Sequence, residues 1–190
     1  GEDRPIEIKS LIDKALQNPD KSIVAKRVKR SEGPFFQFLY QAHKLIAYIF
    51  TGKKINFGNY SCLTYEDSKF ISSKPSLWSS FSGTLKKNLN NLEEIDSTRG
   101  LRYFGPSKMS ILNLILHSLS IIAVFKYHVF IRSLILFLVL WLMNFYIGLV
   151  SIIFQILIIL FNFLIFLVSL RENNFELINS QENLSSEEEI

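Results

Sequence analysis

One stretch decides the architecture of this chain: SLILFLVLWLMNFYIGLVSIIFQILIILFNFLIFLVSL, residues 133–170. None of its 38 residues is charged, and most are Leu, Ile, Phe or Val. As one continuous helix it would be roughly 57 Å long, close to twice the roughly 30 Å of a bilayer's hydrocarbon core. One straight span is therefore excluded, whereas two antiparallel spans fit.

The same stretch predicts where the two spans separate. Asn144, Gly148 and Ser151 interrupt the apolar run, so we expect the turn near 148–151. A buried helical hairpin in a soluble protein is the alternative, but so long an uncharged stretch would leave that hairpin no face toward water. We therefore expect two transmembrane helices within 129–170.

Charge predicts how these spans are oriented. Residues 1–132 carry 20 Lys and Arg against 11 Asp and Glu, a net +9, whereas residues 171–190 carry one Arg against six Glu, a net −5. Lys126 and Arg132 precede the first span, and Arg171 follows the second. Because Lys and Arg near a span favour the cytoplasmic side, we expect a two-span membrane protein with its basic part and its acidic tail both in the cytoplasm.

Composition also limits the partners. The basic surplus suits anionic lipid head groups and phosphorylated substrates. No nucleic-acid recognition motif accompanies it, so we expect no nucleic-acid partner. Cys62 is the only cysteine, which excludes a disulfide framework and a cysteine metal cluster within the chain.

Ahead of the spans, hydrophobic spacing predicts a mixed domain. We expect helices over 5–17 and 35–50, a strand over 22–27, and a short strand and turn over 55–63, with Gly58-Asn59 as the turn. Residues 64–98 indicate a mixture of helix and loop. The tail 171–190, rich in Glu, Asn and Ser, is predicted to be disordered.

Residues 110–125 indicate an amphipathic helix with a narrow polar stripe. Ser110, Asn113, His117 and Ser120 recur at steps of three, four and three among apolar residues. Since this helix comes just before the spans, we expect 109–128 to lie in the membrane interface. Packing into the core of the preceding domain is the alternative.

The segment RGLRYFGPSKMS (99–110) is the most informative motif. It gathers Arg99, Arg102 and Lys108 around a loop that contains Gly105 and Pro106. Clustered Arg and Lys on such a loop can hold a pyrophosphate or a lipid phosphate through charge-assisted hydrogen bonds. A cluster that only grips lipid head groups is an equally good interpretation of the residues alone.

Four segments in this order carry a resemblance to a known family: GEDRP (1–5), KRVKRSEG (26–33), FGNYS (57–61) and RGLRYFGPSKMS, followed by the interfacial helix and the spans. Together they resemble the C-terminal part of bacterial membrane-anchored family 2 glycosyltransferases, of which the dolichyl-phosphate mannose synthases are the nearest well-described set. The resemblance implies that 1–108 is the second half of an α/β nucleotide-sugar-binding domain of the GT-A type, mainly helical with few strands.

The resemblance also implies what precedes Gly1. In the family an Asp-x-Asp motif runs directly into an acidic or Gln-containing loop and a helix that begins with Pro, as GEDRPIEI would here. We therefore expect a fragment that lacks its nucleotide-binding half and is inactive by itself. Glu2 takes the place of a Gln that helps to bind Mg²⁺ or Mn²⁺, and a carboxylate oxygen suits either ion. A solvated terminal acid is the alternative for Glu2.

Further roles follow from the resemblance. Arg102 and Lys108 match the R-x-x-G-x-S-K loop of the family and are the first candidates for binding phosphate, with Arg99 next. Arg27 matches the Arg that ends the G-S-R strand and faces the donor or acceptor phosphate, although Ala25-Lys26 replace Gly-Ser here. A plain surface arginine is the alternative for Arg27.

The acceptor side is less well defined. Asn59 and Ser61 stand where relatives have an S-G-F-R segment that lines the acceptor pocket, but this chain lacks that Arg. Glu66 and Asp67 are adjacent acids that do not match a family base, so the catalytic residue stays unassigned.

The resemblance thus implies an inverting, metal-dependent glycosyltransferase of cell-envelope polysaccharide assembly. It would move a sugar from a nucleotide-sugar donor to a membrane acceptor, which we expect to be a polyprenyl phosphate. Membrane lipids and a second copy of the chain are further candidate partners. The alternative is a non-enzymatic membrane adaptor that binds anionic lipid through its basic loop.

Overall fold

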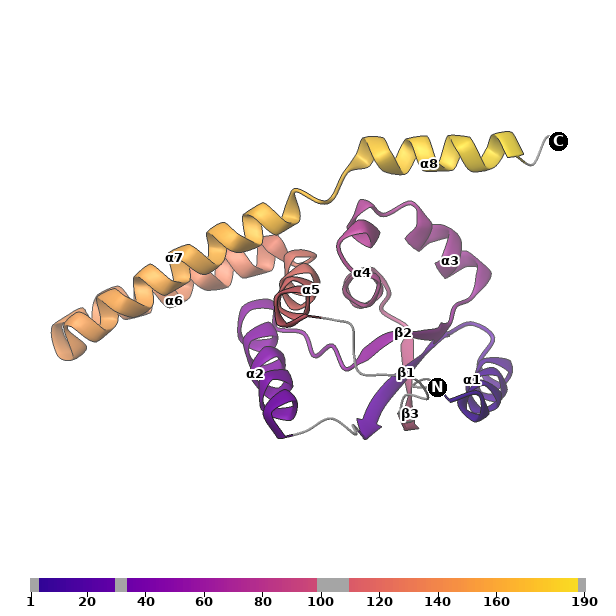
Figure 1. Ribbon diagram of the computed structural model, residues 1–190, viewed down its shortest axis with the longest axis horizontal. Coiled ribbons are helices and arrows are strands. Elements are labelled where there is room, and N and C mark those ends of the chain that lie inside the picture. Colours follow the sequence, from indigo (N-terminus) through magenta and orange to yellow (C-terminus); the bar gives the residue numbers. More distant parts are fainter. Residues whose placement is uncertain (1–3, 30–33, 99–109, 188–190) are drawn as a thin grey trace. The chain divides into compact units, whose positions relative to one another are not determined.

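The computed structural model describes residues 4–29, 34–98 and 110–187. The chain forms two compact units, drawn in Figure 1. Unit 1 comprises Gly1–Ser31, Asn56–Pro106 and Leu170–Ile190, and unit 2 comprises Glu32–Ile55 and Ser107–Ser169. The described residues are mostly helical and include one small sheet, so the coarse fold class that we expected is confirmed.

The sheet of unit 1 has three strands in the order β2-β1-β3. The central strand β1 (Ser22–Lys29) pairs antiparallel with β2 (Phe57–Cys62) and parallel with β3 (Leu92–Thr98). Ile23 lies opposite Cys62 on one side and opposite Glu93 on the other. The parallel pairing means that β1 and β3 end at the same edge of the sheet.

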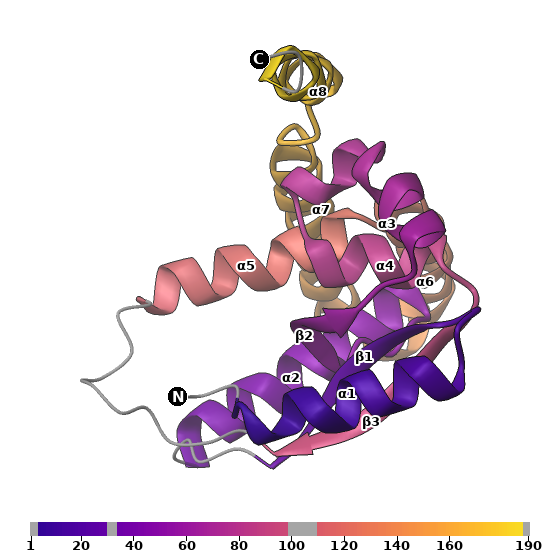
Figure 2. The same ribbon diagram turned by 90° about the vertical axis from the view of Figure 1, so that its right-hand side faces the viewer.

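Helices cover both faces of this sheet, as Figure 2 shows. On one face α1 (Ile6–Gln17) packs Leu11 against Ile23 and Ala25. On the other face Val24 packs against Ile71 of α3 (Tyr65–Ser72) and Leu85 of α4 (Phe81–Asn88), with the short 3₁₀ helix η1 (Pro75–Trp78) between these two helices in the chain. Three consecutive apolar residues of β1 are therefore buried, as in strands that are covered on both faces.

Side-chain caps explain where three of the helices begin. Thr64, Ser80 and Ser110 precede α3, α4 and α5 (Ile111–Ala123), and each is extended rather than helical. Each hydroxyl accepts a hydrogen bond from the backbone N–H three residues later, at 3.1 to 3.2 Å. Such caps satisfy an N–H group that has no partner within the helix, typically for about 1 kcal/mol.

Unit 2 is entirely helical in its described part. It contains α2 (Pro34–Thr51), α5, α6 (Lys126–Ile147) and α7 (Leu149–Ser169). Its core consists of small and branched apolar residues from all four helices: Ala47, Ile122, Ala123, Val129, Ile165 and Val168. We had assigned 35–50 to the catalytic part, but in the structure α2 belongs to the same unit as the two long apolar helices.

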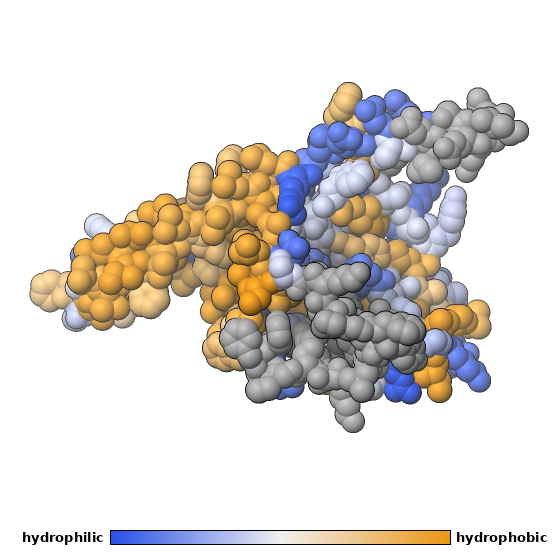
Figure 3. Space-filling model, in the orientation of Figure 1, coloured by the Kyte–Doolittle hydropathy of each residue, from blue (hydrophilic) through white to orange (hydrophobic). Residues whose placement is uncertain are grey.

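The helices α6 and α7 are long and apolar enough to cross a membrane. Their most apolar segments have mean hydropathies of 2.0 and 2.8, and only 6% and 11% of these segments are buried within the protein. Figure 3 shows the resulting apolar surface along α6 and α7. The helices separate at Gly148, whose φ of 52° suits glycine, so the predicted break is confirmed.

A polar seam runs along α7 and faces its neighbours. Ser151, Gln155, Asn162 and Ser169 are spaced by four, seven and seven residues, which brings them to one side of the helix. Ser151 is fully buried, and its hydroxyl donates to the backbone carbonyl of Leu140 in α6. Asn162 donates to the carbonyl of Ile158 at 2.7 Å.

The predicted interfacial helix has a divided environment. In α5 the apolar Ile111 and Leu112 are exposed, as are the polar Asn113 and His117. The C-terminal half is buried in the core of unit 2, where the hydroxyl of Ser120 donates to the carbonyl of Leu116 at 2.8 Å. The polar stripe of the sequence therefore reaches an exposed surface only along the first half of the helix.

Three predictions about local structure differ from the fold. Gly58-Asn59 form no turn, because both lie inside β2. Residues 92–98, expected as helix or loop, form β3. The tail, expected to be disordered, contains α8 (Asn174–Glu187), whose first turn is capped by Asn173.

Arg132 of α6 closes the C-terminal end of α2. Its guanidinium donates to the carbonyl of Ile49 at 3.2 Å, which gives this carbonyl of the last helical turn a partner. Gly52, at φ 71°, follows the helix and lies directly beneath the guanidinium. A Cβ atom at position 52 would lie 2.8 Å from Cζ of Arg132, so any larger residue must displace this side chain.

We predict that Gly52→Ala destabilises the protein by about 2 kcal/mol, roughly half from the left-handed backbone and half from the lost hydrogen bond. The measurement is denaturant unfolding of the detergent-solubilised protein, followed by circular dichroism. In an Arg132→Gln background the same change should cost about 1 kcal/mol, because no guanidinium remains to be displaced. An equal cost in both backgrounds would contradict this account.

Candidate functional site

The carboxyl ends of β1 and β3 form the edge where a ligand site is best placed. In open sheets, ligands bind beyond the carboxyl ends of parallel strands. The backbone of Arg27 lies opposite that of Ser97, and Lys29 lies opposite Thr98, so both strands end here together. The residue that the resemblance links to a phosphate, Arg27, is therefore in the last part of β1 at this edge.

The basic loop starts from the same edge. Arg99 follows Thr98 directly in the chain, so the segment 99–109 leaves β3 next to the end of β1. Arg99, Arg102 and Lys108 themselves lie outside the described residues, and so does Glu2. The topology brings the start of the loop to Arg27, while the roles of these four side chains stay predictions from the sequence.

Asn59 and Ser61 lie on β2, away from that edge. Ser61 is opposite Val24, three residues before Arg27, which corresponds to roughly 10 Å along the strand. Asn59 is exposed, and its carbonyl accepts a hydrogen bond from the hydroxyl of Ser61 at 3.5 Å. An acceptor pocket that used both residues would have to extend along β2 as well as across the edge.

The acidic pair Glu66-Asp67 lies at the opposite end of β1. The hydroxyl of Ser22 donates to Oδ2 of Asp67 at 2.5 Å and accepts from the backbone N–H of Thr64 at 3.1 Å. Ser22 is fully buried and lies five residues, or roughly 16 Å, before Arg27. Asp67 therefore ties α3 to the start of the central strand, which is a structural contact rather than a position for a base beside Arg27.

Ion pairs stabilise the amino edge of the sheet. Glu93 of β3 accepts from Lys14 at 2.7 Å and from Lys21 at 3.1 Å. These hydrogen bonds, the one from Lys14 above all, hold the pKa of the Glu93 carboxyl below its ordinary value. At the carboxyl edge Lys26 pairs with Asp96 at the longer distance of 3.7 Å.

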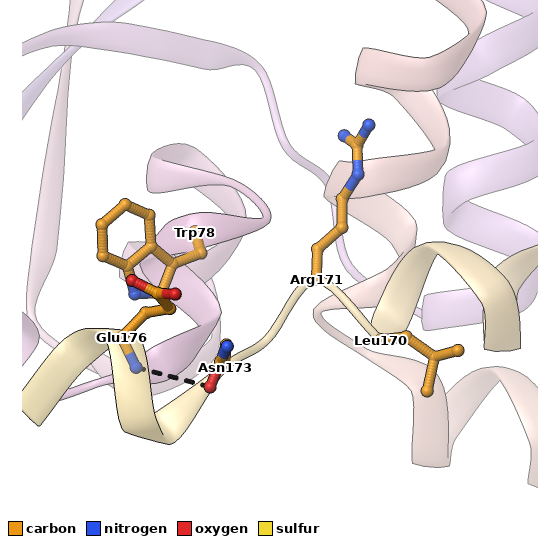
Figure 4. Close-up of a pocket in the computed structure, with 5 residues that line it drawn as sticks. All are labelled: Trp78, Leu170, Arg171, Asn173 and Glu176. Carbon is orange, nitrogen blue, oxygen red and sulfur yellow. Dashed lines mark hydrogen bonds between the residues drawn. The ribbon is translucent and has the colours of Figure 1, made fainter.

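A hollow of about 430 Å³ lies elsewhere in unit 1, lined by Trp78, Leu170, Arg171, Asn173 and Glu176. Figure 4 shows the guanidinium of Arg171 pointing away from the indole of Trp78. The side-chain oxygen of Asn173 already accepts the backbone N–H groups of Phe175 and Glu176, at 3.0 and 3.4 Å. Because its polar groups do not converge, we do not assign this hollow a ligand.

Metal binding is not visible in the described part of the chain. Residues 4–29, 34–98 and 110–187 bring together no group of three His, Cys, Asp or Glu side chains that could hold an ion. Glu2, the ligand that the resemblance implies, lies outside those ranges. The expectation of Mg²⁺ or Mn²⁺ therefore rests on the sequence alone.

Comparisons with protein families, with curated proteins and with solved structures give no match for this chain. The site is therefore argued from its own residues and topology.

Sequence reasoning missed the contact between Ser22 and Asp67, although a signal for it was present. Thr64 and Asp67 have the spacing of a helix cap, with a hydroxyl at the first position and an acid three residues later. That spacing predicts Asp67 in the first turn of a helix, where the structure has it. Nothing in the sequence indicates Ser22 as its partner, because 45 residues separate the two.

We predict that Glu93→Gln destabilises unit 1 at neutral pH and that this difference disappears in acid. Because the pKa of Glu93 is lowered in the folded state, its contribution is present above the ordinary value of 4.5 and is lost as the pH falls through the lower folded value. The measurement compares thermal unfolding midpoints of both proteins across this range. Curves that stay parallel down to the acid limit would contradict the role of this carboxylate.

We predict that Asp67→Ala lowers the free energy of unfolding by about 1–3 kcal/mol, because the buried hydroxyl of Ser22 loses its acceptor. The matched control is Glu66→Ala, an exposed neighbour on the same helix turn, which should change stability by less than about 0.5 kcal/mol. Denaturant unfolding measures both. Equal effects of the two substitutions would argue against the Ser22 contact.

Proposed function

We propose that this chain is the membrane-anchored second half of an inverting, metal-dependent glycosyltransferase that moves a sugar from a nucleotide-sugar to a polyprenyl phosphate. The observation that carries the proposal is the order of four motifs, GEDRP, KRVKRSEG, FGNYS and RGLRYFGPSKMS, ahead of two apolar helices. Each motif alone occurs widely, whereas their order is specific.

The topology of unit 1 supports this proposal. Two of the four motifs, the one around Arg27 and the one that begins at Arg99, come from strands that end together at one edge of the sheet. Phosphate groups commonly bind at such edges in α/β proteins. In the complete enzyme we expect further strands, from an upstream half with the Asp-x-Asp motif, to extend the sheet into a GT-A domain.

The chemistry assigns each group one task. Mg²⁺ or Mn²⁺, held by Glu2 and the upstream Asp-x-Asp, would neutralise the departing nucleoside diphosphate. An oxygen of the acceptor phosphate forms the new bond to the anomeric carbon while the bond from that carbon to the diphosphate breaks, which inverts the configuration. Since this oxygen is already anionic, no strong general base is needed. Arg27, Arg99, Arg102 and Lys108 would hold the phosphates.

The membrane helices support a lipid-linked acceptor. Lys126 and Arg132 stand at the start of α6 and Arg171 follows α7, so the cations gather at one end of the hairpin. We propose that this end is cytoplasmic, where nucleotide-sugars are available. A lipid phosphate in that leaflet would then lie at the depth of the basic loop, which precedes α5 by a single residue.

The experiment uses the full-length protein with its upstream half, reconstituted with polyprenyl phosphate, Mg²⁺ or Mn²⁺, and a panel of labelled nucleotide-sugars. We predict that Arg102→Ala lowers kcat/KM by about 10- to 100-fold, because a charge-assisted hydrogen bond to phosphate is lost. Lys69→Ala, which removes an exposed cation of α3, is the matched control and should leave turnover unchanged.

The same experiment separates the enzyme from the membrane adaptor. An adaptor binds anionic lipid through the basic loop but does not bind nucleotide-sugar. Full turnover in Arg102→Ala would remove Arg102 from the mechanism. A full-length chain without an Asp-x-Asp motif before Gly1 would overturn the proposed reaction.

A further inference from the structure

Cationic side chains gather at the C-terminal end of α2, apart from the basic loop. Arg132 is held there by the carbonyl of Ile49 and rests on Gly52. Lys53 and Lys54 follow Gly52 directly, and both are exposed. The backbone N–H of Lys53 donates to the hydroxyl of Thr51 at 3.1 Å, which fixes the turn that carries the two lysines.

These charges exceed what the helix end requires. The C-terminal end of a helix carries roughly −0.5 of an elementary charge, and one cation more than balances it. Three cations leave more than two positive charges uncompensated. The described residues of unit 2, 34–55 and 110–169, include no Asp or Glu that could pair with them. This concentration of positive charge suits an anion that comes from outside the chain.

The surroundings indicate a lipid rather than a free anion. Arg132 is the last charged residue before the uncharged stretch 133–170. Beside the cations, α2 exposes large apolar side chains: Phe38, Leu45, Tyr48 and Ile49. A phospholipid offers both a phosphate for the cations and acyl chains for this apolar face, and cationic side chains commonly hold their charges at the level of the head groups.

We propose that Arg132, Lys53 and Lys54 form a binding site for the phosphate of an anionic membrane lipid. The guanidinium, already oriented by Ile49, gives the site a fixed donor, and the two lysines add charge around it. The site is separate from the sugar-transfer edge of unit 1, and it does not depend on the proposed reaction.

The test titrates the detergent-solubilised protein with dioctanoyl phosphatidylglycerol and measures binding by native mass spectrometry. Lys53→Ala/Lys54→Ala should weaken binding on the order of thirtyfold, since each lysine near a membrane surface contributes a severalfold gain. Lys69→Ala/Lys74→Ala removes the same charge from exposed or half-buried positions of unit 1 and should leave the affinity unchanged. Arg132→Lys keeps the charge without the oriented fork and should give an intermediate loss.

Two further ligands separate the sources of the phosphate. Inorganic phosphate and uncharged dioctanoyl glycerol should each bind far more weakly than the phospholipid. Equal binding of inorganic phosphate would overturn the lipid as the ligand, and equal binding of the uncharged lipid would overturn the phosphate. Equal losses in the two double variants would show an effect of net charge only and would overturn the site.

Discussion

Hydrocarbon is the constraint on which the rest of this structure depends. A stretch of 38 residues without a charge cannot remain in water, and within a bilayer its backbone must satisfy its own hydrogen bonds, which a helix does. Length then requires two helices, and Gly148 supplies the break. The cations on either side of the stretch follow from the same requirement, because their charges must stay at the water boundary.

Much of the architecture could be predicted from the sequence, because the signals were local. The hairpin, its break and the helices over 6–17, 34–51 and 111–123 all follow from hydrophobic spacing and from residues that begin or end helices. The central strand β1 was also visible as a β-branched run. In these segments one or two turns of chain contain the whole signal.

The two outer strands were not predictable in this way. Gly58-Asn59 is a common turn pair, yet it lies within β2, because pairing with β1 outweighs the local preference. In β3 the acids Glu93 and Asp96 obscure the strand pattern, and their partners Lys14, Lys21 and Lys26 come from other elements. The candidate site was predictable only as separate motifs, because the register of β1 with β3 is a long-range property. That register brings Arg27 to the origin of the basic loop.

The polar seam of α7 limits how the hairpin can move. Gln155 and Asn162 share one side of the helix with Ser151, and the amide nitrogen of Gln155 is enclosed without a partner among the described residues. Turning α7 about its axis by a third of a revolution would expose both amides to acyl chains, at several kcal/mol each. The seam thus works as a rotational lock: α7 can tilt together with α6 but cannot spin against it. Any motion that begins in the bilayer must reach Arg171 as a rigid tilt.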